Sequence, residues 1–245
     1  MPFDDKVVLV AGGTGALGRE VAMAFLEAGA RVAVTYRRPE EFAAFVTAAE
    51  RTGTQAPEGA SLDVTDVAAV ESYVAELAAR HGRLDILVNA VGGYGGGKNV
   101  WEASAADYDQ MTALNFKAGF ALAHAAVPVM IRQNRGWILN VASKAAYGHS
   151  PGAALYAASK AAAMVLIESL AEEVKAYNIN VNSIVPSIFD TAANRQAMPK
   201  ADFAKWPKPE QIARVVLFLC SEDARLIHGA AIPVYGRTQF ESVYP

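Results

Sequence analysis

Short runs of β-branched and other apolar residues alternate along the chain with longer stretches in which apolar residues recur every three or four positions. The short runs have the length and composition of buried strands, and the longer stretches have the periodicity of helices. This alternation is typical of βαβ units in a mainly parallel sheet. The pattern predicts strands at Lys6–Ala11, Arg31–Tyr36, Gly59–Val64, Leu84–Ala90, Gly136–Ala142, Ile179–Val185 and Ala230–Tyr235.

Helices are predicted between these strands. Gly29 follows the first helix as a stop signal, and Ser104 with Asp107 has the spacing of a capping box before the fourth. The predicted helices are Ala16–Ala28, Pro39–Arg51, Val67–Arg80, Ala105–Gln133, Ala154–Tyr177 and Pro209–Cys220. Residues 1–245 are therefore expected to form one α/β domain, a doubly wound parallel sheet of about seven strands with helices on both faces.

Two segments interrupt this rhythm. Residues 92–97 contain five glycines, which give the backbone conformations and close approaches that other residues do not allow. Residues 186–208 are too long for an ordinary connection and carry Phe189, Met198, Phe203 and Trp206. A segment of this kind is either a lid over a site or an ordered excursion that packs against the body or a partner subunit.

Composition narrows the class of protein. The 245 residues are 53% hydrophobic and 19% charged, which supports a sizeable core and excludes intrinsic disorder. A net charge of −3 without any basic block argues against a nucleic-acid partner. Cys220 is the one cysteine, and the four histidines are scattered, so neither a disulfide framework nor a metal site is expected.

Export and membrane insertion are not expected. The first residues are acidic and lack the basic start and apolar core of a signal peptide. The longest stretch free of formal charge within an apolar segment, Ala118–Ile131, is shorter than the roughly 20 residues of a membrane span. The sequence thus predicts a soluble, cytoplasmic protein.

A glycine-rich sequence follows the first predicted strand and opens the first helix. Read from Gly13 it is G-x-G-x-x-G, in which glycines permit a tight turn and close approach of a pyrophosphate to the helix N-terminus. The strand, turn and helix setting predicts a Rossmann-type dinucleotide site. Its expected cofactor contacts are Gly12, Thr14, Gly15, Ala16, Leu17 and Gly18.

The end of the second strand indicates which dinucleotide binds. A site for NAD places an acid there to hold the ribose hydroxyls, but this chain has Tyr36-Arg37-Arg38. The two guanidinium groups are suited to bidentate recognition of a 2′-phosphate, so NADP(H) is predicted. The alternative is that both arginines are solvated and pair with Glu40 and Glu41.

A candidate for proton transfer lies in the fifth predicted helix. Tyr156 and Lys160 are four residues apart, which places the phenol and the ammonium on one helix face. A neighbouring cation favours the phenolate, so the tyrosine pKa is expected to be lowered toward the range of a general acid. Ser143 ends the fifth strand, where its hydroxyl is placed to donate to a substrate oxygen.

With these motifs together, the chain resembles the short-chain dehydrogenases/reductases over nearly its whole length. The resemblance implies that Tyr156 is the proton donor and that Lys160 lowers its pKa and anchors the ribose. It further implies that Ser143 orients the carbonyl and that Asn115 holds a proton-relay water. The cofactor contacts implied in addition are Tyr156, Lys160, Asp63, Val64, Asn89, Ala90, Val91, Pro186, Ile188 and Thr191.

The match to the family has departures. Ala16 replaces a glycine, Val91 follows Asn89-Ala90 in place of the usual Ala, and Pro186 is followed by Ser187 in place of glycine. Segments 13–18, 92–96, 190–203 with Trp206, and 236–238 resemble the dihydropteridine reductase branch. Those enzymes usually carry an acid at position 36 and lack a serine at position 143, and the step from Ser143 to Tyr156 resembles ketoreductases.

The leading hypothesis is an NADP(H)-dependent oxidoreductase that transfers hydride to a C=O or C=N carbon of a small molecule while Tyr156 donates the proton. The alternatives are a quinonoid dihydropteridine reductase and a non-catalytic NADP(H) sensor. The apolar run 161–167 on the fifth helix is expected to pack against the sheet or a partner helix. By resemblance to related enzymes, a homodimer or homotetramer is expected.

Overall fold

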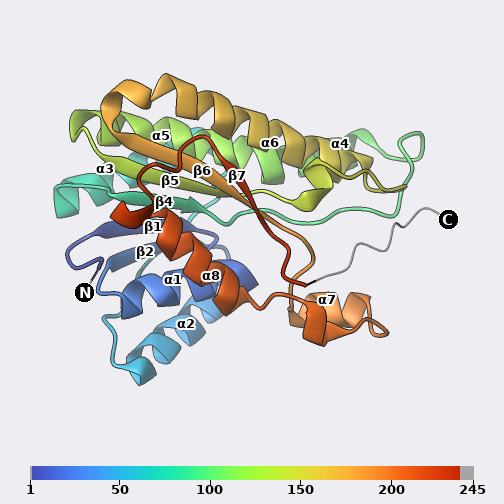
Figure 1. The fold of residues 1–245 in the computed structure, drawn as a ribbon, viewed down its shortest axis with the longest axis horizontal. Coiled ribbons are helices and arrows are strands. Elements are labelled where there is room, and N and C mark those ends of the chain that lie inside the picture. The colour runs from blue at the N-terminus through green and yellow to red at the C-terminus, as the bar shows by residue number, and fades with distance from the viewer. Residues whose placement is uncertain (1, 238–245) are drawn as a thin grey trace.

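The computed structural model describes residues 2–237, so Thr238 of the last family-like segment lies outside the described residues. Within them, seven parallel strands form one sheet in the order β3-β2-β1-β4-β5-β6-β7. The predicted fold class is therefore confirmed, with helices in two layers on either side of the sheet (Figure 1). The strands are β1 Val7–Ala11, β2 Arg31–Tyr36, β3 Glu58–Ser61, β4 Ile86–Asn89, β5 Gly136–Val141, β6 Ile179–Pro186 and β7 Ala231–Val234.

Strand β1 shows why the sheet needs helices on both faces. Val7, Leu9 and Ala11 belong to one apolar cluster with residues of α3, α5 and α6. Val8 and Val10 belong to the opposite cluster, with residues of α1, α2 and α8. Successive side chains of a strand point to opposite faces, so a wholly apolar strand is stable only when both faces are covered. The helices are α1 Ala16–Glu27, α2 Pro39–Thr52, α3 Val67–His81, α4 Ala105–Thr112, α5 Ala118–Arg132, α6 Ala154–Glu173, α7 Ala192–Ala197 and α8 Pro209–Leu219.

The predicted continuous helix Ala105–Gln133 was wrong. A π-helical turn at Ala113–Lys117 separates α4 from α5. Asn115 lies at its centre, 2% exposed, and its side chain bonds to a loop rather than to solvent. Single π-turns within helices are frequent at functional sites because they redirect a side chain.

Several predicted boundaries also need correction. The third strand was predicted as Gly59–Val64 but ends at Ser61, because Asp63 accepts hydrogen bonds from the backbone and hydroxyl of Thr65 and turns the chain away. The fourth strand is shorter than Leu84–Ala90, and α6 ends at Glu173 rather than Tyr177, where Lys175–Tyr177 forms a 3₁₀ turn.

Two helical stretches, Ala105–Arg132 and Ala154–Glu173, meet the length and composition of a membrane span, with 44% of the most apolar window buried in each. Core helices of globular proteins have the same character, and here the two stretches supply Leu122, Met130 and Ile167 to the core against the sheet. Their apolar composition is thus explained by packing on one face.

The 186–208 segment connects β6 to α8 in the described structure. It holds α7 and a 3₁₀ turn at Phe203–Lys205, and it projects beyond the sheet (Figure 1). Its inner contacts are an Asp190–Arg195 ion pair, the Phe203–Trp206 ring contact at 5.0 Å and the burial of Trp206. A hydrogen bond from Asp190 N to Pro207 O joins the beginning and the end of the segment.

Candidate functional site

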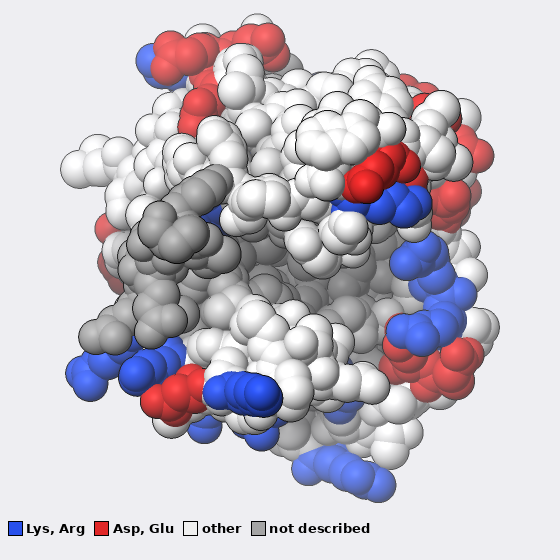
Figure 2. Space-filling model, turned by 90° about the vertical axis from the view of Figure 1, so that its right-hand side faces the viewer, with Lys and Arg blue, Asp and Glu red and all other residues white. Residues whose placement is uncertain are grey.

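The sheet changes direction of winding between β1 and β4, which are neighbours although β2 and β3 lie between them in sequence. In open α/β sheets, ligands bind at such a switch point, outside the carboxyl ends of the strands. Viewed from this edge, the molecular surface is hollowed, with uncharged side chains in the visible hollow and Lys and Arg beside acidic residues along its right margin (Figure 2). The predicted site residues lie around this edge.

The glycine-rich loop after β1 has the shape required by a dinucleotide. Gly12 adopts φ +73°, and a Cβ there would lie 3.2 Å from Val91 and 3.3 Å from the Ala90 backbone. A Cβ on Gly18 would lie 2.2 Å from the Gly12 carbonyl oxygen, so α1 packs against the loop only because residue 18 is glycine. Thr35 fixes the loop by accepting from Gly12 N through its hydroxyl at 3.0 Å.

The helix that follows presents its N-terminus to this loop. Gly15 is the N-cap of α1 and supplies no side-chain cap, while Gly15 and Ala16 are exposed and Leu17 is buried. Backbone N–H groups at such a helix start favour a phosphate group. The loop, with its missing Cβ atoms and open helix start, therefore fits a pyrophosphate.

The two arginines after β2 are divided between two acids. Arg38 forms an ion pair with Glu41, so the alternative pairing considered from the sequence is present for this residue. Arg37 lies close enough to Asp63 that its charge contributes to lowering the pKa of that carboxyl, after the larger effect of hydrogen bonds from Thr65. Both Asp63 and the two arginines are exposed.

Other predicted cofactor contacts lie at or just after the carboxyl ends of β2, β3 and β4. Tyr36 stacks on Phe42 at 4.6 Å with an interplanar angle of 4°. Val64 is buried in the core, so its side chain is a packing group. Asn89 is 4% exposed, donates to Asn140 Oδ1 at 3.0 Å and accepts from Val91 N at 3.1 Å. It thereby shapes the turn that carries Ala90 and Val91 toward Gly12.

Lys160 is held in a buried position on α6. Its side chain is 5% exposed, and its ammonium donates to the Val141 carbonyl oxygen at 3.0 Å. Burial disfavours the charged form and lowers the pKa of Lys160 to about 8. Nothing in the sequence indicates that the carbonyl at the end of β5 holds this cation, because the acceptor is backbone.

Tyr156 does not have the lowered pKa that the Lys160 spacing predicted. Burial raises the pKa of the phenol, and its hydrogen bond with Ser143 opposes that effect only in part. Lys160 is directed to the Val141 carbonyl and contributes no resolved lowering. Ser143 nevertheless lies within hydrogen-bond reach of Tyr156, two residues after the end of β5 and at the N-cap of the 3₁₀ turn Lys144–Ala146, and Lys160 lies one turn further along α6.

Asn115 and the loop of residues 92–97 form the other wall of the site. The Asn115 side chain accepts a hydrogen bond from Gly93 N at 3.0 Å and donates one to Gly93 O at 3.1 Å. A Cβ on Gly92 would lie 2.8 Å from Lys160 Nζ and 3.0 Å from Asn115 Oδ1. The loop therefore passes between these two side chains only because Gly92 has none.

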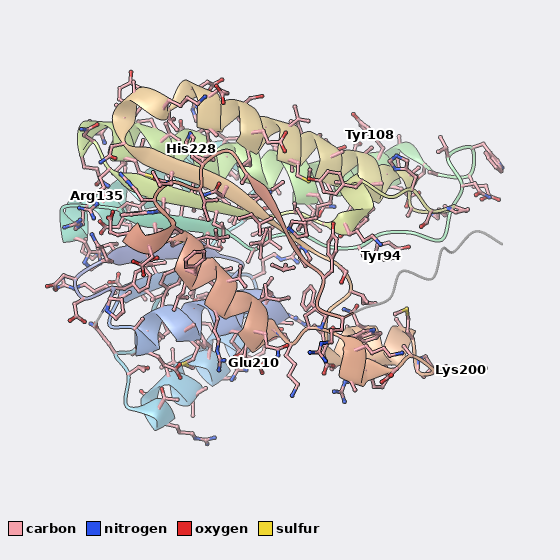
Figure 3. All side chains as sticks on the ribbon, in the orientation of Figure 1. Tyr94, Tyr108, Arg135, Lys200, Glu210 and His228 are labelled. Atoms are coloured by element: carbon pink, nitrogen blue, oxygen red, sulfur yellow. The ribbon has the colours of Figure 1, made fainter. Side chains whose placement is uncertain are left out.

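Tyr94 is a site residue whose position the sequence did not reveal. Figure 3 shows it on the loop after β4, at the edge where the strands end. Its ring meets the Tyr156 ring edge to face at 5.1 Å while 69% of it stays exposed. A Cβ on Gly96 would lie 2.1 Å from the Tyr94 hydroxyl, so this glycine gives the ring its place.

The 186–208 segment contributes its first residues to this edge. Pro186 ends β6 and is buried, whereas Ile188 and Thr191 are half-buried. Thr191 caps α7 by accepting from Asn194 N at 3.1 Å. Lys200 lies at the outer end of the segment (Figure 3), away from the sheet.

Comparison with known proteins identifies the family. A short chain dehydrogenase family model matches residues 6–202. The 3-oxoacyl-[acyl-carrier-protein] reductase FabG of Thermotoga maritima is 30% identical over 96% of this chain and 98% of its own length. The meso-2,3-butanediol dehydrogenase of Serratia marcescens is also 30% identical, over 96% and 95%. A structure of NAD⁺-bound xylitol dehydrogenase superimposes with a TM-score of 0.88 at 26% identity, covering 96% of this chain and 100% of the other.

This chain belongs to the short-chain dehydrogenase/reductase family. It is an oxidoreductase of a family whose members use nicotinamide cofactors and act on small-molecule substrates.

Proposed function

We propose that this protein is an NADP(H)-dependent carbonyl reductase in which Tyr156 gives the proton. The observation that carries the proposal is that Ser143, Tyr156, Lys160 and Asn115 lie together beside the loop of residues 92–97. A site that positions a proton donor next to a hydride source needs little else to reduce a C=O carbon.

The chain's own residues divide the work of such a reduction. Because burial raises the pKa of Tyr156, the phenol keeps its proton at neutral pH and can donate it from Oη to the substrate oxygen. The Ser143 hydroxyl, which bonds to Tyr156, orients that oxygen. Lys160 carries a charge below its pKa of about 8 and is held on the Val141 carbonyl, so it is the cation that would anchor the ribose of the dinucleotide, the second role that the family resemblance implies.

Asn115 fixes the opposite wall of the site. Its two hydrogen bonds to Gly93 hold the loop against Lys160, so it is a positioning residue in addition to the water-holding role implied by the family. A bound nicotinamide dinucleotide would supply or accept the hydride. The residues that would hold it are Gly12, Thr14–Gly18, Tyr36, Arg37, Arg38, Asp63, Val64, Asn89–Val91, Tyr156, Lys160, Pro186, Ile188 and Thr191.

The test is nicotinamide absorbance loss with purified protein, NADPH and a panel of carbonyls. A vicinal diketone and an acetoacetyl thioester are included because relatives are named for butanediol and 3-oxoacyl chemistry. Tyr156→Phe is expected to lower kcat by about 10² to 10⁴-fold, the usual contribution of a general acid. Tyr177→Phe, on a 3₁₀ turn after α6, is the matched control.

Full turnover by Tyr156→Phe on the best substrate would contradict the mechanism. Tight NADPH binding without turnover across the panel would instead favour a non-catalytic sensor, since a fold alone does not dictate activity.

A quinonoid dihydropteridine is the second candidate substrate, and the Tyr94 ring favours it. Its exposed face beside Tyr156 offers a stacking surface for a flat conjugated ring. Chemically generated quinonoid dihydropteridine belongs in the same assay. If pterin turnover exceeds carbonyl turnover and Ser143→Ala leaves it unchanged, reduction without carbonyl orientation is the function. If Ser143→Ala abolishes turnover, the result supports the proposal of a carbonyl reductase.

We further propose a soluble, cytoplasmic homodimer or homotetramer. The outer surfaces of α5 and α6 support this, because Phe120 and Val165 are 42% and 60% exposed on helices otherwise rich in alanine. Light scattering of the purified protein measures the subunit number, and a monomer at micromolar concentration would contradict the proposal.

A further inference from the structure

Glu41 contacts both the glycine-rich loop after β1, through Thr14, and the residues after β2, through Arg38. Its Oε2 accepts from the Thr14 hydroxyl at 3.2 Å, and its Oε1 pairs with the Arg38 guanidinium. The pairing with Arg38, three residues earlier, is local to the start of α2. The bond from Thr14 crosses 27 residues of sequence, so it is the tertiary fold that brings this carboxylate to the glycine-rich loop.

The position of this carboxylate bears on ribose recognition. In this fold the loop after the first strand and the residues after the second flank the ribose, and the group found there reads its 2′ position. NAD sites have an acid at the strand end, but Tyr36 occupies that place and its ring is stacked on Phe42. Glu41 reaches the same space from the first turn of α2, five positions later in the sequence.

Glu41 would compete with a 2′-phosphate for the same hydrogen-bond donors. A 2′-phosphate would need the Arg38 guanidinium and the Thr14 hydroxyl, and Glu41 engages both. Arg37 lies near Asp63, where its charge helps to lower the pKa of that carboxyl, and no contact between Arg37 and Glu41 is present among the described residues. Glu41 is one-third exposed and Arg38 two-thirds, so both side chains have room to separate when a ligand enters.

We propose that Glu41 determines the cofactor specificity of this enzyme. It accepts hydrogen bonds from the ribose hydroxyls of an unphosphorylated dinucleotide, and it must release Thr14 and Arg38 before a 2′-phosphate binds. The inference rests on the proposed dinucleotide site. It predicts that NADPH is preferred less strongly than two free arginines would make it, because one of them is already neutralised.

The test compares two nucleotides that differ only by the phosphate in question. Dissociation constants of adenosine 5′-monophosphate and adenosine 2′,5′-bisphosphate are measured by titration calorimetry in phosphate-free buffer. Glu41→Gln is expected to raise the preference for the bisphosphate about tenfold, equivalent to 1.4 kcal/mol, and to weaken the monophosphate. Glu41→Asp, whose shorter side chain cannot bridge the two partners, is a second variant and is expected to shift the ratio in the same direction.

Glu40→Gln is the matched control. Glu40 is the adjacent acid, it is exposed, and removing it changes the net charge by the same amount. A preference that shifts with Glu41→Gln and not with Glu40→Gln supports the assignment. An unchanged preference in Glu41→Gln, or an equal shift in Glu40→Gln, overturns it and leaves the dinucleotide site standing. Failure of the wild-type protein to bind either nucleotide overturns the dinucleotide site as well.

Discussion

The two ends of the candidate site are held together by different forces. At the catalytic end, Lys160 and Asn115 are nearly inaccessible and their polar groups bond to backbone atoms of Val141 and Gly93. At the ribose end, Arg38 is exposed and Glu41 is one-third exposed, and Glu41 bonds to both Arg38 and Thr14. Buried polar groups are expensive to leave unpaired, whereas exposed ion pairs contribute little and exchange partners easily. The side chains at the catalytic end are therefore held in place, whereas those at the ribose end can change partners when a cofactor binds.

The burial of Lys160 gives the largest expected effect. With its pKa at about 8 in the folded protein and about 10.4 when unfolded, the unfolded chain binds more protons between these values. The free energy of unfolding should therefore rise with pH over this window, by up to roughly 3 kcal/mol relative to Lys160→Met. Urea unfolding of both proteins from pH 7 to 10.5 measures this difference, and a pH-independent difference would contradict it.

Loss of the clamp at Asn115 comes next. Asn115→Ala removes two hydrogen bonds to Gly93, which should lower the free energy of unfolding by about 2 kcal/mol. We also expect a lower kcat with a smaller change in cofactor affinity, because the loop beside Lys160 loses its anchor. Gln110→Ala, an exposed amide on α4, is the control and should change neither quantity. Equal effects of the two substitutions would show that the clamp is unimportant.

At the ribose end, substitutions should alter selectivity rather than stability. Arg37→Asp brings an acid to the end of β2 and should shift preference from NADPH toward NADH by about tenfold, as measured by KM for each cofactor. An unchanged preference would mean that the 2′-phosphate is read by Thr14 and Arg38 without Arg37.

The smallest effect is expected for the exposed ion pair itself. Arg38→Gln breaks the contact with Glu41 and should change the free energy of unfolding by less than about 1 kcal/mol. Urea unfolding under the same conditions as for Asn115→Ala gives the comparison directly. A loss as large as that of Asn115→Ala would remove the distinction between the two ends.

Sequence patterning was sufficient for the architecture and for naming the candidate site residues that the structure places near one another. Strand and helix periodicity depends on local burial, which repeats at fixed spacing, so the order of elements and the doubly wound sheet follow from it. The glycine loop and the Tyr156–Lys160 pair are also local motifs, and their spacing sets their geometry. The helix break at Asn115 does not follow, because its cause is a bond to Gly93, 22 residues away.

Tertiary structure alone decided the electrostatics of the site. The spacing of Tyr156 and Lys160 predicted a lowered tyrosine pKa, but burial raises it and a backbone carbonyl takes the lysine. The sequence likewise left open whether Arg38 faces a phosphate or an acid, and the fold placed Glu41 between it and Thr14. Motifs specify which groups are near one another in the chain, whereas pKa values and ion pairs depend on desolvation and on partners brought from elsewhere.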